Sequence, residues 1–101
     1  MSERAFQFIE SKDKLSLMRE IEKNPAVSIV DIIDHRGYTL LHVAAFKNLE
    51  EIGTKLMQRA IETVTEKQIH QWVNHKTDED GFAAIHFASF RGNITLIQLF
   101  I

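Results

Sequence analysis

One segment of this chain occurs twice, and this duplication constrains the possible folds more than any other feature. Residues 34–45 read DHRGYTLLHVAA and residues 80–89 read DGFAAIHFAS, with Gly37 and Gly81 at equivalent positions. Similarity at a fixed offset is typical of stacked supersecondary units that cannot bury their apolar faces alone. The sequence therefore predicts a repeat protein.

Composition narrows the function classes. A chain of 101 residues with 45% hydrophobic content can form one domain with a buried core. Twelve basic and fourteen acidic residues give a net charge of -2 without a basic block, so we expect no nucleic-acid binding. Without cysteine, and without an apolar segment of membrane-spanning length, we expect an intracellular, cytoplasmic protein with no direct membrane insertion.

Apolar spacing and capping signals predict an all-α fold. Residues 3–23 are expected to form two short helices, with Asp13 as N-cap of the second. Further helices are expected over the ranges 40–47, 50–63, 65–72, 83–90 and 94–101. Residues 26–33 are rich in β-branched side chains, but an isolated strand would have no pairing partner, so we expect an extended loop there.

Two of these helices have unusual apolar patterns. The helix over 50–63 carries Ile52, Leu56, Met57 and Ile61 on one side. Gly53 should weaken that helix by on the order of 1 kcal/mol relative to alanine. The last helix stays apolar through Ile101, without a glycine cap or a polar tail. We therefore expect either that the native chain continues past this residue or that a partner covers this end.

The duplicated segment resembles the ankyrin-repeat family, whose pattern runs Asp-x-x-Gly-x-Thr-Pro-Leu-His-x-Ala-Ala. The first copy matches at Asp34, Gly37, Thr39, Leu41, His42, Ala44 and Ala45, and the second at Gly81, Ile85, His86, Ala88 and Gly92. The helix-starting proline is replaced by Leu40 and Ala84. The resemblance implies one domain over 1–101, an α-solenoid of about three helix-turn-helix units at 3–33, 34–77 and 78–101, with an insertion at 58–77.

The motif residues have structural roles of their own. Thr39 is placed to cap a helix, and His42 follows one turn later, where its ring can bond Thr39 and the backbone of the adjacent loop. His86 is its equivalent, and Gly37 and Gly81 tolerate the positive φ of a tight turn. We expect these five residues to be structural.

The sequence does not favour metal binding or catalysis. His42 and His86 have no thiolate or clustered carboxylate beside them, and His70 and His75 are expected to be solvated. Because no nucleophile-base constellation or phosphate-binding glycine loop occurs, we expect no enzyme activity, cofactor or metal. Trp72 has two interpretations, packing of the insertion, which we favour, or an exposed anchor for a partner.

The resemblance implies a protein-protein interaction module that binds a protein or peptide on its concave face. Our candidate contact residues are Arg36, Tyr38, Phe46, Lys47, Phe82, Phe90 and Arg91. Tyr38 and Phe82 could instead pack against the neighbouring turn. An alternative function is a recruiting or targeting segment of a larger enzyme or membrane protein whose active part follows Ile101. A third hypothesis is self-association through the C-terminal helix.

Overall fold

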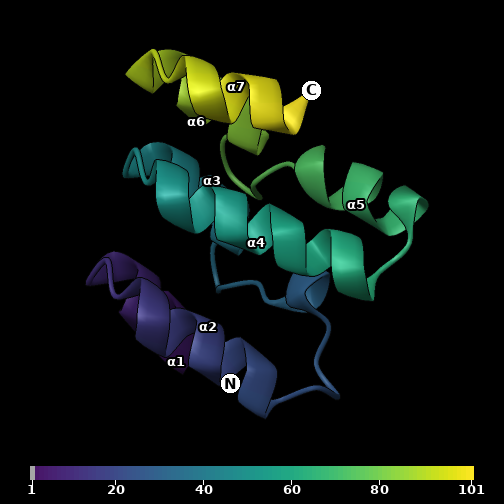
Figure 1. The fold of residues 1–101 in the computed structure, drawn as a ribbon. Helices are drawn as coiled ribbons and strands as arrows, with labels where there is room; N and C mark the ends of the chain where they lie inside the picture. Colours follow the sequence, from purple (N-terminus) through teal and green to yellow (C-terminus); the bar gives the residue numbers. More distant parts are fainter. Residues whose placement is uncertain (1) are drawn as a thin grey trace.

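The chain folds into helices joined by short loops, as the computed structural model shows for residues 2–101 (Figure 1). These are α1 (Ser2–Glu10), α2 (Lys14–Lys23), a 3-10 turn η1 (Ile29–Asp31), α3 (Leu40–Phe46), α4 (Glu50–Thr63), α5 (Glu66–Val73), α6 (Ala84–Arg91) and α7 (Ile94–Phe100). No strand occurs in this part of the chain. The predicted all-α fold is confirmed.

Three helix pairs stack on one another (Figure 1). The pairs are α1 with α2, α3 with α4, and α6 with α7, and in the sequence the two helices of each pair are separated only by a short turn. One layer is formed by α1, α3 and α6, which contact each other in that order, while α7 packs on α4 in the second layer. The additional helix α5 contacts α4 and η1 beside the stack.

Side-chain caps define several helix starts. The Asp13 carboxylate accepts a hydrogen bond from the Ser16 N–H at 3.1 Å, as expected for the N-cap of α2. At the start of α5, the Thr65 hydroxyl accepts from the Gln68 N–H while the Gln68 side chain accepts from the Thr65 N–H. Asn93 caps α7 by accepting from the Leu96 N–H. Each cap satisfies a helix N–H that lacks an intrahelical partner.

Residues 26–33 form an irregular loop, as predicted from the lack of a pairing strand. The turn η1 lies within this loop, and a single antiparallel bridge joins Ile33 to Thr39. Ile29 and Ile32 are buried. The β-branched side chains of this segment therefore contribute to the core without forming a sheet.

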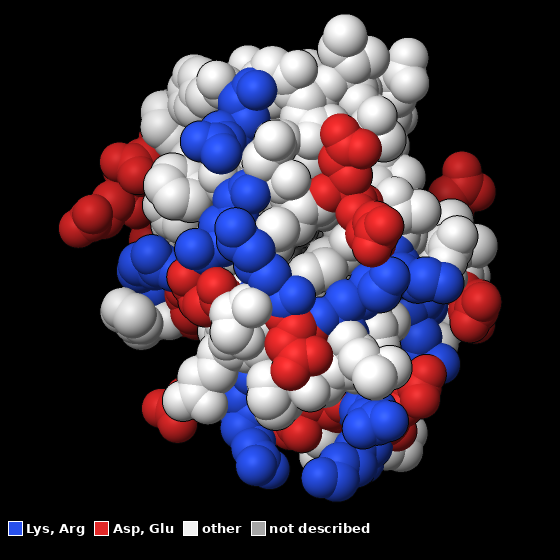
Figure 2. Space-filling view, turned by 60° about the vertical axis from the view of Figure 1, so that its left-hand side comes forward, with Lys and Arg blue, Asp and Glu red and all other residues white. Residues whose placement is uncertain are grey.

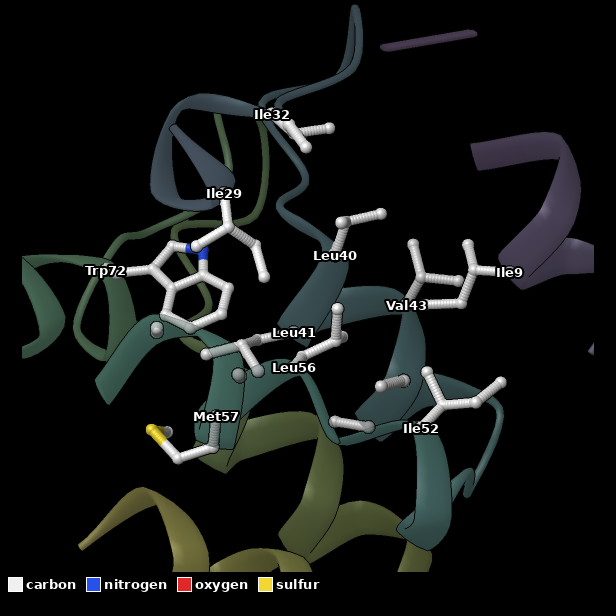
Figure 3. Packing of buried hydrophobic residues seen from close by; sticks show 14 of the residues in the cluster. Ile9, Ile29, Ile32, Leu40, Leu41, Val43, Ile52, Leu56, Met57 and Trp72 are labelled. Carbon is white, nitrogen blue, oxygen red and sulfur yellow. The ribbon is translucent and has the colours of Figure 1, made fainter. Parts of the chain in front are cut away.

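The core is continuous from α1 to α7. Figure 3 shows Trp72 of α5 beside Ile29 of η1, with Leu41 of α3 and Leu56 of α4 below them. Trp72 is buried, as the packing interpretation predicts. Burial of its apolar ring stabilises the fold, and the buried Nε1, which has no hydrogen-bond partner among residues 2–101, offsets part of that gain. Helix α5 is thereby fastened to the rest of the molecule.

One expectation for α4 was wrong. Ile61 is 64% exposed and does not share the buried side of Ile52, because it follows Ile52 by nine positions, or two and a half turns, and so lies on the opposite side of the helix. Gly53 is buried, and a Cβ at this position would lie 2.7 Å from Cδ2 of Leu96 in α7. The missing side chain allows α7 to pack closely on α4.

We predict that Gly53→Ala lowers the free energy of unfolding, because an overpacking cost of about 1–3 kcal/mol exceeds the gain in helix propensity of about 1 kcal/mol. The measurement is urea unfolding of the four proteins of a double-mutant cycle with Leu96→Ala. In the Leu96→Ala background, which removes the clashing methyl group, Gly53→Ala should become stabilising. The same sign in both backgrounds would contradict the contact.

Candidate partner-binding surface

The surface predicted to bind a partner depends on one buried histidine, His42. Its Nδ1 accepts a hydrogen bond from the Thr39 N–H at 3.0 Å and lies 2.9 Å from the Thr39 hydroxyl oxygen. Its Nε2 lies 2.9 Å from the backbone carbonyl oxygen of Phe82, forty positions along the chain. The side chain therefore caps α3 and ties it to the turn that precedes α6.

These contacts fix the protonation of His42. A backbone N–H can only donate, so Nδ1 must be the unprotonated nitrogen, and Nε2 carries the hydrogen donated to Phe82. Burial lowers the pKa of His42, and the hydrogen bond to Phe82 offsets only part of that effect. A second proton would face the Thr39 N–H and place a positive charge at the start of a helix, where the dipole disfavours it.

We predict that the protein loses stability as the pH falls from 7 to 5. Since the folded pKa of His42 lies below its ordinary value of 6.5, the unfolded state binds more protons in this range, and stability present above pH 6.5 is lost below it. Denaturant midpoints at several pH values measure the effect. His42→Gln should be less stable at pH 7 and show a smaller fall; equal falls in both proteins would contradict the assignment.

Asp34 organises the turn that precedes α3. Its carboxylate accepts hydrogen bonds from the N–H groups of Arg36 and Tyr38, and its other oxygen lies 2.7 Å from the Arg36 guanidinium. Burial acts to raise the pKa of Asp34, but the Arg36 side chain and the two N–H groups outweigh it and hold the pKa below its usual value. The Arg36 guanidinium in turn lies 4.2 Å from the centre of the Tyr38 ring.

The turn around Gly37 packs against the segment that leads to α6. Gly37 has a φ of +79°, and the Asp78 side chain covers it so closely that a Cβ would lie 2.5 Å from Oδ1. The Asp78 N–H donates to the Arg36 carbonyl, and Nε2 of His75 lies 3.2 Å from the Gly37 carbonyl oxygen. The expectation of a solvated His75 was wrong, because this segment folds back onto the first turn.

We predict that Gly37→Ala costs more stability than Gly81→Ala. Both glycines have positive φ, which costs alanine about 1–2 kcal/mol. At Gly81 a Cβ meets nothing within 4 Å, whereas at Gly37 it displaces Asp78, which adds about 1–3 kcal/mol. Thermal unfolding of the two variants side by side gives the comparison, and equal losses would show that Asp78 moves away freely.

Aromatic rings line the layer formed by α3 and α6 and the turns before them. We call this set the aromatic surface: Tyr38, Phe46, Phe82, Phe87 and Phe90. Phe87 is its buried centre, and the ring centroids of the other four lie 5.7 to 6.4 Å from its own. Most of the pairs are edge-to-face, a favourable arrangement for aromatic rings.

The members of the aromatic surface differ in exposure. Tyr38 and Phe82 are half-buried, and both pack on Phe87. Phe46 at the end of α3 and Phe90 near the end of α6 are 57% and 69% exposed. These two phenylalanines occupy equivalent positions in the duplicated segment and are the accessible part of this surface.

The charged candidates are partly neutralised by neighbours. Lys47 pairs with Glu10 of α1 at 3.1 Å, and Arg36 pairs with Asp34. Arg91 has no carboxylate partner among residues 2–101. Figure 2 shows Lys and Arg side chains across the middle of the molecule with carboxylates beside them, and fewer charges toward the upper end. Arg36 and Lys47 are therefore partly neutralised, whereas Arg91 is not.

The second copy of the duplicated segment forms only some of the hydrogen bonds that His42 makes in the first copy. His86 Nδ1 accepts from the Ala83 N–H at 2.9 Å, as His42 does from Thr39. Ala83 has no hydroxyl, and His86 is exposed, so its ring contributes a local cap without linking two turns. His70 is exposed, and among residues 2–101 no three His, Asp or Glu side chains gather as metal ligands would.

Three residues that build this surface were not singled out for it from the sequence. Phe87 stands where the first copy has Val43, and its ring joins the four predicted aromatic residues. Asp34 matched the family pattern, but its bonds to the turn were not foreseen. No pattern in the sequence indicated that Asp78 contacts Gly37. A comparison of the two copies position by position could have pointed to Phe87.

Neither the protein-family models, nor the curated proteins, nor the solved structures compared with this chain include a match. Within residues 2–101, every helix is too short or too polar to cross a lipid bilayer.

Proposed function

We propose that this chain is an array of ankyrin-like units that binds a protein or peptide on its aromatic surface. The observation that carries the proposal is the pair of exposed phenylalanines, Phe46 and Phe90, which stand at equivalent positions on the adjacent helices α3 and α6. The stacked helix pairs, the positive φ at Gly37 and Gly81, and the bond from His42 to the next turn support the ankyrin-like interpretation.

The two exposed rings have the properties of binding anchors. Phe46 packs edge-on against the buried Phe87 at 5.8 Å, and Phe90 contacts both Phe82 and Phe87. Side chains held in this way lose little conformational freedom when a partner covers them. Aromatic residues at such positions commonly supply a large share of binding energy.

The surrounding charges indicate the partner's chemistry. Arg91 adjoins Phe90 and is unpaired within residues 2–101, while Glu79 and Asp80 are exposed on the turn before Phe82. A segment with an apolar side chain between the two phenylalanines and an acidic residue facing Arg91 fits this pattern. Lys47 and Arg36 already pair with Glu10 and Asp34. We therefore expect them to contribute less than Arg91 to the attraction of an acidic partner.

We predict that the double variant Phe46→Ala with Phe90→Ala binds peptides selected against the unmodified protein more weakly than the unmodified protein does. The probe is a displayed library of random peptides, from which enriched sequences are synthesised and measured by fluorescence polarisation. Loss of two aromatic anchors should weaken binding at least tenfold, since each such residue contributes on the order of 1–2 kcal/mol or more.

The matched control is Leu15→Ala with Ile61→Ala, because these aliphatic side chains are 62% and 64% exposed on other helices. This variant should bind the selected peptides as the unmodified protein does. If no peptide is enriched, or if both double variants bind equally well, the aromatic surface is not the binding site.

A further inference from the structure

A cavity of about 250 Å³ lies between the loop around η1 and helix α5. Its lining includes Val30, Asp31 and Ile33 from the loop and Gln68, Gln71 and Trp72 from the helix. Small-molecule sites in proteins usually measure about 300 to 1,000 Å³, so this cavity suits a group of about the size of one amino acid. The duplicated segment and its aromatic surface do not account for it.

One hydrogen-bond donor beside this cavity is buried and unused. Nε1 of Trp72 has no hydrogen-bond partner among residues 2–101, although the side chain is only 3% exposed. Figure 3 shows this nitrogen on the edge of the indole ring that faces Ile29 in η1, the element that carries Val30 and Asp31 of the opposite wall. Because buried donors in folded proteins are nearly always paired, we expect an acceptor to be bound here.

Gln68 adds a second donor to the lining. Its side-chain oxygen accepts a hydrogen bond from the Thr65 N–H at 3.0 Å, which fixes the orientation of the amide at the start of α5. The amide nitrogen of Gln68 therefore keeps its hydrogens for a ligand. Donors on two side chains of the lining suit a ligand with a carbonyl oxygen, since such an oxygen can accept two hydrogen bonds.

Asp31 gives the cavity a negative charge. It is the only Lys, Arg, Asp or Glu in the lining, and its carboxylate forms no ion pair with residues 2–101. His75 also lines the cavity, but its Nε2 is bound to the Gly37 carbonyl oxygen at 3.2 Å. A positively charged group would meet an unpaired carboxylate here, whereas an anion would be repelled.

We propose that the cavity between η1 and α5 binds a cationic ligand of about amino-acid size that also carries a carbonyl group. The carbonyl oxygen accepts from Nε1 of Trp72, and the positive charge pairs with Asp31. An arginine residue has both groups, either in a small free derivative or within a peptide chain. The site is separate from the aromatic surface, since no member of that surface lines the cavity.

The test is a titration of the ¹⁵N-labelled chain followed by ¹H–¹⁵N correlation spectra. Trp72 is the only tryptophan, so its indole N–H gives a single cross-peak. The probes are α-N-acetyl-arginine amide and its neutral, nearly isosteric counterpart, α-N-acetyl-citrulline amide. The arginine probe should move this cross-peak downfield until it saturates. The citrulline probe should bind at least about threefold more weakly, because it lacks the charge that pairs with Asp31.

Two variants assign the charge. Asp31→Asn keeps the shape of an exposed side chain and should lower the affinity for the arginine probe to that for the citrulline probe. The matched control is Glu62→Gln, which removes the same charge from an exposed position of α4 outside the cavity and should bind as the unmodified protein does. An indole cross-peak that no probe moves, equal binding of the two probes, or equal affinities of the two variants would each overturn the proposal.

A third probe, an acetylated and amidated Gly-Gly-Arg-Gly-Gly peptide, identifies the source of the ligand. Binding of this peptide at least as tight as that of the capped arginine would assign the cavity to an arginine of a protein partner. Exclusion of the peptide would assign it to a free small molecule. None of the probes has an aromatic side chain, so the result does not depend on peptide binding at the aromatic surface.

Discussion

The hydrogen bonds of His42 are the interaction on which the arrangement of the second and third helix pairs depends. A single imidazole, wholly inside the protein, joins the cap of α3 to the backbone of Phe82. Both ring nitrogens are used, so the side chain satisfies the polar groups it meets without leaving a buried donor or acceptor unpaired. The loss of one partner would therefore affect two distant parts of the chain together.

The aromatic surface is a consequence of that connection. With Phe82 held against α3, Phe87 of α6 comes within ring contact of Tyr38 and Phe46, which belong to the preceding turn and helix. The proposed binding surface and the stability of the fold thus depend on neighbouring groups. The buried hydrogen bonds of His42 hold α3 and the turn before α6 together, and that spacing determines where the exposed rings of Phe46 and Phe90 lie.

The helices could be predicted from the sequence because their signals are local. Asp13, Thr39 and the pair Thr65 and Gln68 cap the helices that they precede, as apolar periodicity and capping chemistry indicate. Contacts between different helices and turns could be predicted less well from the sequence. The role of Gly53 depends on Leu96 and that of His75 on Gly37, and nothing in the neighbouring sequence reveals such pairings. Four of the five rings of the candidate surface were named from the sequence, but the buried ring of Phe87 and the division into supporting and exposed rings were not.

The burial of Trp72 also means that α5 carries its own fluorescent probe. It is the only tryptophan of the chain, and it lies where α5 meets η1, away from the contacts between α3 and α6. Its emission reports whether α5 is docked, whereas helical circular dichroism is dominated by the stacked pairs. If α5 detaches before the stack melts, the two signals will change at different denaturant concentrations, and the local opening of one helix can be separated from the unfolding of the whole molecule.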